Sequence, residues 1–243
     1  FGVWLGCPWA GLSACPLVAY VRPRPFNLPT PAPCLLHFIR RMGLVAVGLS
    51  VSDILSKPID RGWFFLAGLT LVSGFLPVKL PSVSASISIS ETFVFAGTIL
   101  FGPSVGAVLV LLDAGVLSAR VSLTKKRRLR FEQVLFNLAA PALSIWVAAH
   151  LARIRPPASV DSSDALVFVG SLAAFTVLYF LSNSWLVTFA ISLEKGAAPF
   201  SIWWNNFKEL LVNYAAGASI AALLVYNKKE VSLTFIGVIL PLL

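Results

Sequence analysis

Long uncharged runs separated by short basic clusters limit what this chain can fold into more than any other feature. A helix needs about 20 apolar residues to cross roughly 30 Å of hydrocarbon. In lipid the backbone must satisfy its own hydrogen bonds, which a helix does. The sequence therefore predicts an all-α fold, a polytopic membrane helix bundle of about six spans. The uncharged runs are residues 62–78, 92–112 (continuing past Asp113 to 119), 133–149, 165–193 and 210–227, and a sixth extends from 231 to 243.

Composition excludes a soluble domain of this length. Hydrophobic residues form 58% of the chain and charged residues 12%, whereas soluble domains carry about 25% charged residues. So little polar surface cannot cover a soluble fold, and the mean hydropathy of +0.86 agrees. The lipid bilayer is the expected solvent and first partner of this chain.

The positive charges indicate which side of the membrane each loop faces. The net charge is +9, and segment 120–130 holds six basic residues and no acid. Such a loop stays in the cytoplasm. Alternating the spans from it puts twelve basic residues inside, Arg40, Arg41, Lys57 and Arg61 among them, and five outside. We expect both ends of the membrane region in the cytoplasm and the protein in the bacterial inner membrane, with no nucleic acid as partner.

The second span is interrupted at Gly102-Pro103. Proline removes a helical hydrogen bond and disfavours helix at the residue before it. We expect two helical pieces between residues 92 and 119, the first of them either re-entrant or simply kinked by packing. Broken membrane helices often border binding sites, because their freed backbone groups must face protein or water.

Serine alternates with apolar residues in segment 82–90, just before this span. A period of two indicates extended backbone. The segment is either a loop at the membrane boundary or a polar lining that folds into the bundle. It is one short alternating segment, whereas a membrane β-barrel needs many.

The first 41 residues differ from the rest, because neither helical periodicity nor a capping pattern continues through them. We expect residues 1–41 to be poorly ordered or to lie upstream of the true start, 42–61 to be a cytoplasmic lead-in, and 62–243 to be the transmembrane bundle with its last span truncated. The three cysteines, Cys7, Cys15 and Cys34, match no zinc or redox spacing. With only His37 and His150 as histidines, we expect no metal, no cofactor and no catalytic site in this chain.

Polar residues at membrane depth are the remaining candidates for function: Glu91, Asp113, Asn137, Asn183, Asn205, Asn206 and Asn213. Ionisable groups there are costly and often functional. Each of these residues also has a structural interpretation. Asparagines form hydrogen bonds between helices. Asp113 can pair with Arg120 two turns away, and the Glu91 carboxylate can stabilise the N-terminus of the following helix. From this set and the serine segment, the candidate ligand-binding residues are Ser88, Ser90, Glu91, Asp113, Asn137 and Asn183. We also expect segment 82–90, Glu91 and the Gly102-Pro103 break to line one cavity.

Several stretches resemble the N-terminal membrane region of bacterial signalling proteins: residues 66–74, 87–95, 100–103, 135–144, 179–184 and 237–243. In that family a cytoplasmic HD-GYP phosphohydrolase domain, or sometimes a GGDEF domain, follows the membrane region. The resemblance covers about residues 62–243. It implies a sensory or anchoring input region in cyclic di-GMP signalling, with its output domain absent here. The full-length protein would then be a cyclic di-GMP phosphodiesterase.

Two classes of function therefore stay open. The first is this sensory input region, whose partners would be a small ligand of unknown class, the cytoplasmic output domain and, as an open alternative, a second copy in a homodimer. The second is a small membrane transporter or substrate-binding membrane subunit, which a broken span and buried polar residues would also suit. Cytoplasmic placement of the C-terminus favours the first.

Overall fold

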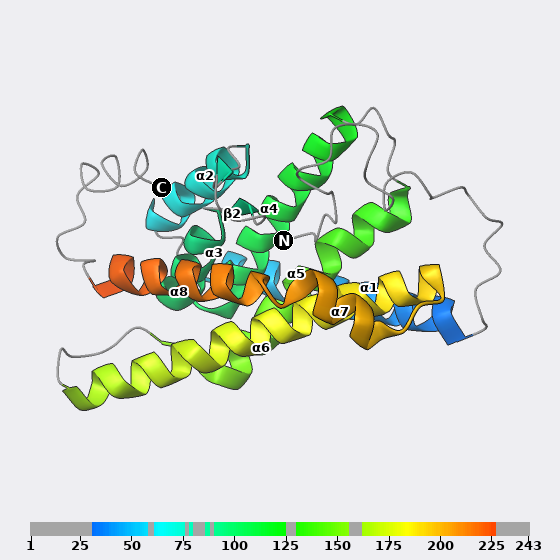
Figure 1. Ribbon diagram of the computed structural model, residues 1–243. Helices are drawn as coiled ribbons and strands as arrows, with labels where there is room; N and C mark the ends of the chain where they lie inside the picture. The colour runs from blue at the N-terminus through cyan, green and yellow to red at the C-terminus, as the bar shows by residue number, and fades with distance from the viewer. Residues whose placement is uncertain are drawn as a thin grey trace.

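The structure, a computed structural model, describes residues 31–57, 61–75, 78–79, 86–87, 90–124, 130–155 and 162–226. Within these residues the chain is helical apart from one short ladder. The elements are α1 (Pro31–Leu55), α2 (Arg61–Phe75), β1 (Val78–Lys79), β2 (Ser86–Ile87), α3 (Ser90–Phe101), α4 (Pro103–Thr124), α5 (Phe131–Ala152), α6 (Ser162–Lys195), α7 (Pro199–Phe207) and α8 (Leu210–Tyr226) (Figure 1). The expected all-α fold is confirmed for this part of the chain.

Four helices, α1, α4, α5 and α6, are long and apolar enough to cross a membrane. Helices α7 and α8 together form a fifth candidate, bent by 53° at their junction. Two shorter apolar helices, α2 and α3, complete the bundle. The membrane helix bundle is therefore supported with four or five candidate spans, and the apolar run at 231–243 lies outside the described residues.

Helix α1 passes through one of the expected domain boundaries. It begins at Pro31 and passes through the boundary at residue 41, and Ile39 is buried against Phe136 and Ala140. Its stretch Cys34–Leu55 is itself a candidate span. From Pro31 onward the structure thus has a helix where a poorly ordered segment was expected up to residue 41, and the cytoplasmic lead-in over 42–61 stays a prediction. Residues 1–30 lie outside the described residues.

The two ends of α1 lie at opposite ends of the bundle. Arg40 Nη2 lies 3.5 Å from Glu132 Oε2, at the start of α5. At the far end of α1, Asp53 accepts a 2.6 Å hydrogen bond from Ser104, at the start of α4, and pairs with Lys57 at 2.7 Å. The charge count had put Arg40 and Lys57 on one side of the membrane, whereas the structure separates them by about 25 Å along α1. The side on which each residue lies stays a prediction.

Helices α3 and α4 form an antiparallel hairpin rather than one broken span. Gly102 provides the turn with φ of +98°, a conformation that favours glycine. Thr98 lies against Gly106, and Leu109 lies against Gly97, so the two helices approach closely where side chains are absent. The expected break at Gly102-Pro103 is confirmed, and so are two helical pieces. The first folds back along the second because these glycines leave room for it.

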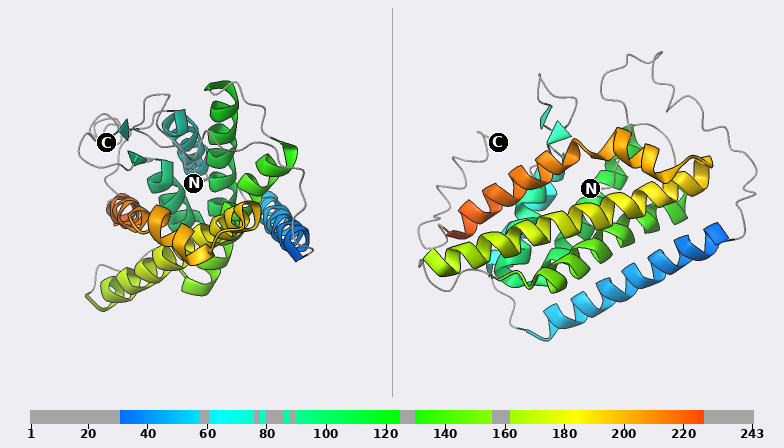
Figure 2. Two further views of the ribbon diagram at one scale, coloured as in Figure 1. Left: turned by 45° about the vertical axis from the view of Figure 1, so that its right-hand side comes forward. Right: turned by 60° about the horizontal axis from the view of Figure 1, so that its bottom comes forward.

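The short helix α3 lies at the centre of the bundle and packs against α2, α4 and α8. Residues 90–99 are all buried. Helix α1 lies at one edge (Figure 2) and packs on α5 and α4. The hydrophobic core therefore surrounds α3, which places the N-terminus of α3 inside the bundle.

Helix α6 has 34 residues, about 51 Å at the usual helical rise, which exceeds the roughly 30 Å of hydrocarbon. It must therefore tilt or project from the bilayer. Helices α7 and α8 lie along it (Figure 1). Trp203 of α7 stacks on Trp185 with ring centroids 5.6 Å apart, and its indole N–H donates to Ser184 Oγ at 2.9 Å.

Candidate functional site

The N-terminus of α3 brings an acid into the middle of the bundle. Ser90, Glu91 and Thr92 are buried, and Glu91 is only 3% exposed. Helix α8 approaches this point at Gly217, where an added methyl group would lie 3.8 Å from the Glu91 Cβ. A carboxylate suits the first turn of a helix. However, burial of that carboxylate within a bundle is costly unless its charge is compensated.

A hydrogen-bonded chain joins Glu91 to α8 and α6. The Asn183 amide donates to the Tyr214 hydroxyl oxygen at 3.1 Å. The Tyr214 hydroxyl in turn is hydrogen-bonded to Glu91. Asn183, Tyr214 and Glu91 thus connect three helices through one buried path.

The second carboxyl group of the site comes from α4. Asp113 is 4% exposed and lies close enough to Glu91 to interact with it electrostatically. On its other side, Asp113 Oδ1 faces Gly74 of α2, where an added methyl group would lie at 3.2 Å. Asp113 therefore sits where α2, α3 and α4 meet. We call Glu91, Asp113, Tyr179, Asn183 and Tyr214 the polar cluster.

Glu91 Oε1 and the Tyr179 hydroxyl have no hydrogen-bond partner among the described residues. Tyr179 is fully buried and interacts electrostatically with both Glu91 and Asp113. Five other buried hydroxyls of the bundle differ, because they bond a carbonyl one turn earlier in their own helix. Ser50, Thr70, Thr98, Ser144 and Thr176 do so at 2.7–2.8 Å. Glu91 and Tyr179 thus bring two such atoms into the polar cluster, while the unpartnered Arg40 Nε, Trp63 Nε1, Thr188 Oγ1 and Asn213 Nδ2 lie elsewhere among the described residues.

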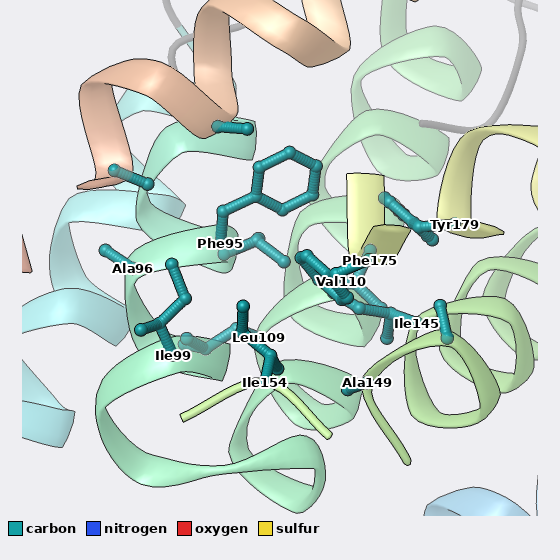
Figure 3. Close-up of a cluster of buried hydrophobic side chains, with 14 of the residues drawn as sticks. Phe95, Ala96, Ile99, Leu109, Val110, Ile145, Ala149, Ile154, Phe175 and Tyr179 are labelled. Atoms are coloured by element: carbon teal, nitrogen blue, oxygen red, sulfur yellow. The ribbon is translucent and has the colours of Figure 1, made fainter. Parts of the chain in front are cut away.

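Aromatic rings form the apolar wall beside the cluster. The ring of Phe95 makes edge contacts with Phe175 at 5.2 Å and with Tyr179 at 5.6 Å. Tyr179 and Tyr214 lie 5.4 Å apart, and Phe180 meets Tyr214 at 5.3 Å. Figure 3 shows Phe95, Phe175 and Tyr179 in the same buried cluster as Leu109 and Val110. This wall lowers the local dielectric constant and so strengthens any electrostatic contact made by the carboxylates.

Three of the six predicted site residues meet in this cluster: Glu91, Asp113 and Asn183. Ser90 is buried beside Glu91 at the start of α3, and Ser88 lies outside the described residues. Asn137 is half-buried on α5 between Phe136, which packs on α1, and Leu138, which faces Gly115 of α4. None of the contacts of the described residues joins Asn137 to the cluster.

The predicted common cavity of the serine segment, Glu91 and the helix break is wrong in one respect. Glu91 and Gly102 lie at opposite ends of α3, about 16 Å apart along the helix axis. They cannot line one small site. Of the serine segment, Ser86 and Ile87 are extended as predicted and pair with β1, and Ser90 is helical. The rest of that segment lies outside the described residues.

Sequence reasoning missed the two tyrosines. Tyr179 lies four residues before Asn183, which puts both on one face of α6, so helical spacing alone could have found it. Tyr214 follows Asn213, already noted as a polar residue at depth. Its contact with Glu91 joins residues far apart in sequence and has no sequence signal.

Comparison with protein-family models, with curated proteins and with solved structures found no match for this chain. Among the described residues, no group of three or more His, Cys, Asp or Glu side chains is placed to hold a metal ion. The arrangement that the structure does bring together is a pair of acids, two tyrosines and an amide at the centre of a membrane helix bundle.

Proposed function

We propose that this chain is the membrane-embedded sensory input region of a bacterial signal-transduction protein and that the polar cluster is its ligand site. The observation that carries the proposal is Glu91, buried at the point where α3, α4, α6 and α8 meet. An ionisable group at such depth is expensive and is retained where it has a task. Ligand binding there acts on four helices at once.

The topology that goes with this function has six crossings and both ends in the cytoplasm. The crossings are α1, α4, α5, α6, the α7–α8 pair and the apolar run 231–243, and α2 and α3 form a short excursion into the bundle. Lys57 and Arg61 then move to the outer side and Lys79 lies within the excursion, so the count becomes ten basic residues inside against six outside. The bias persists because six of the ten belong to the segment 120–130.

The output in this proposal is a cytoplasmic HD-GYP domain, or a GGDEF domain, following the last crossing. The support for it is the sequence resemblance together with a C-terminus on the cytoplasmic side. Tyr214 links the site to α8, the last described helix before that crossing. A ligand shifts the output only if it binds two states of the bundle with different affinity.

Substitution of Glu91 tests the proposal in the native full-length protein, with its output activity measured with and without stimulus. Glu91→Gln is expected to abolish the response and to leave expression and thermal stability nearly unchanged. Glu132→Gln is the matched control, because Glu132 is exposed at the end of the bundle. If Glu91→Gln lowers stability while the surviving protein still responds, Glu91 is structural and the proposal fails.

A transporter or substrate-binding membrane subunit is the second candidate, and one observation favours it. The buried N-terminus of the short helix α3 resembles the half-helices that border midplane sites in transporters. The two functions separate by transport into proteoliposomes containing this chain alone. Accumulation of a solute that depends on Glu91 would favour the transporter, and a response of an attached output domain without accumulation would favour the sensor.

A further inference from the structure

The exposed residues of α7 differ in kind from those of α8. Helix α8 exposes mostly apolar side chains: Leu211, Val212, Ala215, Ser219, Leu223 and Tyr226. Helix α7 and its junction with α8 expose two aromatic rings, two uncharged polar side chains and two charges: Phe200, Ser201, Trp204, Asn205, Lys208 and Glu209. Exposed side chains of a membrane helix face lipid, where charged and amide groups are costly. The exposed side of α8 therefore suits hydrocarbon, whereas that of α7 does not.

Two rows of side chains run along the exposed face of α7. The aromatic row consists of Phe200 and Trp204, one turn apart with ring centroids at 6.1 Å, and Lys208 continues it with its ammonium 5.4 Å from the Trp204 ring centroid. The polar row consists of Ser201 and Asn205, also one turn apart, and the Asn205 amide donates to the Ser201 hydroxyl at 3.4 Å. Aromatic rings beside a polar row, with a basic residue at the end, are typical of helices that lie in the membrane interface.

Helix α7 lies at the end of the bundle where α5 begins. Trp203, on the packed side of α7, stacks on Trp185 of α6. Leu186, the residue after Trp185, packs against the buried cluster that includes Ile39, and the neighbouring Arg40 pairs with the start of α5. The two rows of α7 are therefore close to one end of the bundle, where a membrane-spanning bundle meets the lipid headgroups.

Helix α8 is long enough to cross the bilayer without α7. It has 17 residues, and the shortest helices that cross a bilayer have about 17. Its last residue, Tyr226, packs against Phe168 near the start of α6, with ring centroids 6.4 Å apart, so α8 leads from one end of the bundle toward the other. The bend of 53° turns α7 away from that direction. The nine residues of α7 are thus not needed for the crossing.

We propose that α7 lies in the headgroup region of the bilayer, in the leaflet at the end of the bundle where α5 begins, and that α8 alone makes the crossing. The partner of the exposed face of α7 is thus the phospholipid surface of one leaflet. The aromatic row inserts at the boundary with the acyl chains, Lys208 reaches the lipid phosphates, and the polar row faces headgroups and water. This inference goes beyond the proposed function and leaves the number and direction of the crossings unchanged.

The depth of single spin labels tests this placement in the full chain, reconstituted in phosphatidylcholine vesicles. The three native cysteines are replaced by serine, and one label is attached to each of Phe200→Cys, Ser201→Cys, Trp204→Cys and Asn205→Cys. Oxygen, which concentrates in hydrocarbon, and a water-soluble nickel chelate are then compared for how strongly each relaxes the label. Ser219→Cys, on the exposed face of α8 near its middle, is the reference for hydrocarbon.

An interfacial α7 predicts that labels in the aromatic row are relaxed more by oxygen and that labels in the polar row are relaxed more by the nickel chelate. The label at Ser219 should show the strongest preference for oxygen. The proposal is overturned if the polar row also prefers oxygen, because α7 would then lie in hydrocarbon as part of the crossing. It is also overturned if the aromatic row prefers the chelate, since α7 would then lie in water.

A matched pair of lysine substitutions provides a second test that needs no label. Asn205→Lys adds a charge where we place the headgroups, so the thermal unfolding midpoint in the same vesicles should change by less than about 2 °C. Ser219→Lys adds the same charge where α8 faces hydrocarbon, and it should lower the midpoint by at least about 5 °C or prevent insertion. Equal effects at the two positions would overturn the proposal.

Discussion

At the scale of single residues, two neighbouring buried tyrosines differ in what their hydroxyls do. Tyr214 accepts from Asn183 and is hydrogen-bonded to Glu91. Tyr179, with its ring 5.4 Å away, has no hydrogen-bond partner among the described residues. An unmade hydrogen bond of a buried group costs about 1–3 kcal/mol. The same tyrosine-to-phenylalanine change should therefore act in opposite directions at the two positions.

Tyr179→Phe should raise the free energy of unfolding by about 1 kcal/mol, because it removes a buried polar group and keeps the ring. Tyr214→Phe should lower it by about 1–2 kcal/mol, since Asn183 and Glu91 each lose a partner. Thermal unfolding of both variants in the same detergent measures the difference. Equal losses at the two positions would show that the Tyr179 hydroxyl has a hydrogen-bond partner in the protein.

At the scale of elements, the position of α1 depends on one glycine. A methyl group at Gly43 would lie 2.5 Å from the Ala139 carbonyl oxygen of α5, whereas a methyl group at Gly48 would meet nothing within 4 Å. The backbone of α5 cannot move aside as a flexible side chain could. Gly43 is therefore the point of closest contact between α1 and α5.

Gly43→Ala should destabilise the bundle by about 1–3 kcal/mol through overpacking, and Gly48→Ala should change stability by less than about 0.5 kcal/mol. Both substitutions lie on one helix and add the same methyl group, so helix propensity and hydrophobicity are matched. Thermal unfolding of the two variants gives the comparison. If Gly43→Ala is as stable as Gly48→Ala, the contact between α1 and α5 is not as close as described.

The helices also show which features of the fold could be predicted from sequence patterns. The break at Gly102-Pro103 was predictable, because both residues act locally on the backbone. The direction of α3 was not, since it depends on contacts of Thr98 with Gly106. Helix α1 was missed because only eleven uncharged residues separate Arg41 from Asp53. Its flanking charges are accommodated by Glu132, Ser104 and Lys57, and those partners are visible only in the fold.

Part of the candidate site could also be predicted from local signals in the sequence. Glu91, Asp113 and Asn183 are polar residues within apolar runs, which is a local signal. Their meeting point depends on α3 folding back along α4 and on α8 approaching at Gly217. Tyr214 joins the cluster only through that packing. Local chemistry thus indicated three members of the cluster, helical spacing from Asn183 could have indicated Tyr179, and long-range packing determined Tyr214.

At the scale of the whole molecule, the direction of α1 through the bundle determines on which side of the membrane its flanking loops lie. Arg40 lies by the start of α5 and Lys57 lies by the start of α4, so α1 leads from one end of the bundle to the other. If the basic segment 120–130 is cytoplasmic, Arg40 is near the cytoplasm and Lys57 is near the exterior. The charge count alone had put Lys57 on the cytoplasmic side. The side on which Lys57 lies therefore tests whether α1 crosses the membrane.

Reporter fusions after Lys57, Lys126 and Asp161 should give exterior, cytoplasm and exterior, because α1, α4 and α5 each cross the bilayer once. Alkaline phosphatase, active only outside, and green fluorescent protein, fluorescent only inside, provide opposite readouts at each position. The fusion after Lys126 is the control, since the positive-inside bias fixes it independently of α1. A cytoplasmic result after Lys57 with the other two as expected would show that α1 does not cross. Reversed results after Lys126 and Asp161 would instead contradict the orientation of the entire bundle.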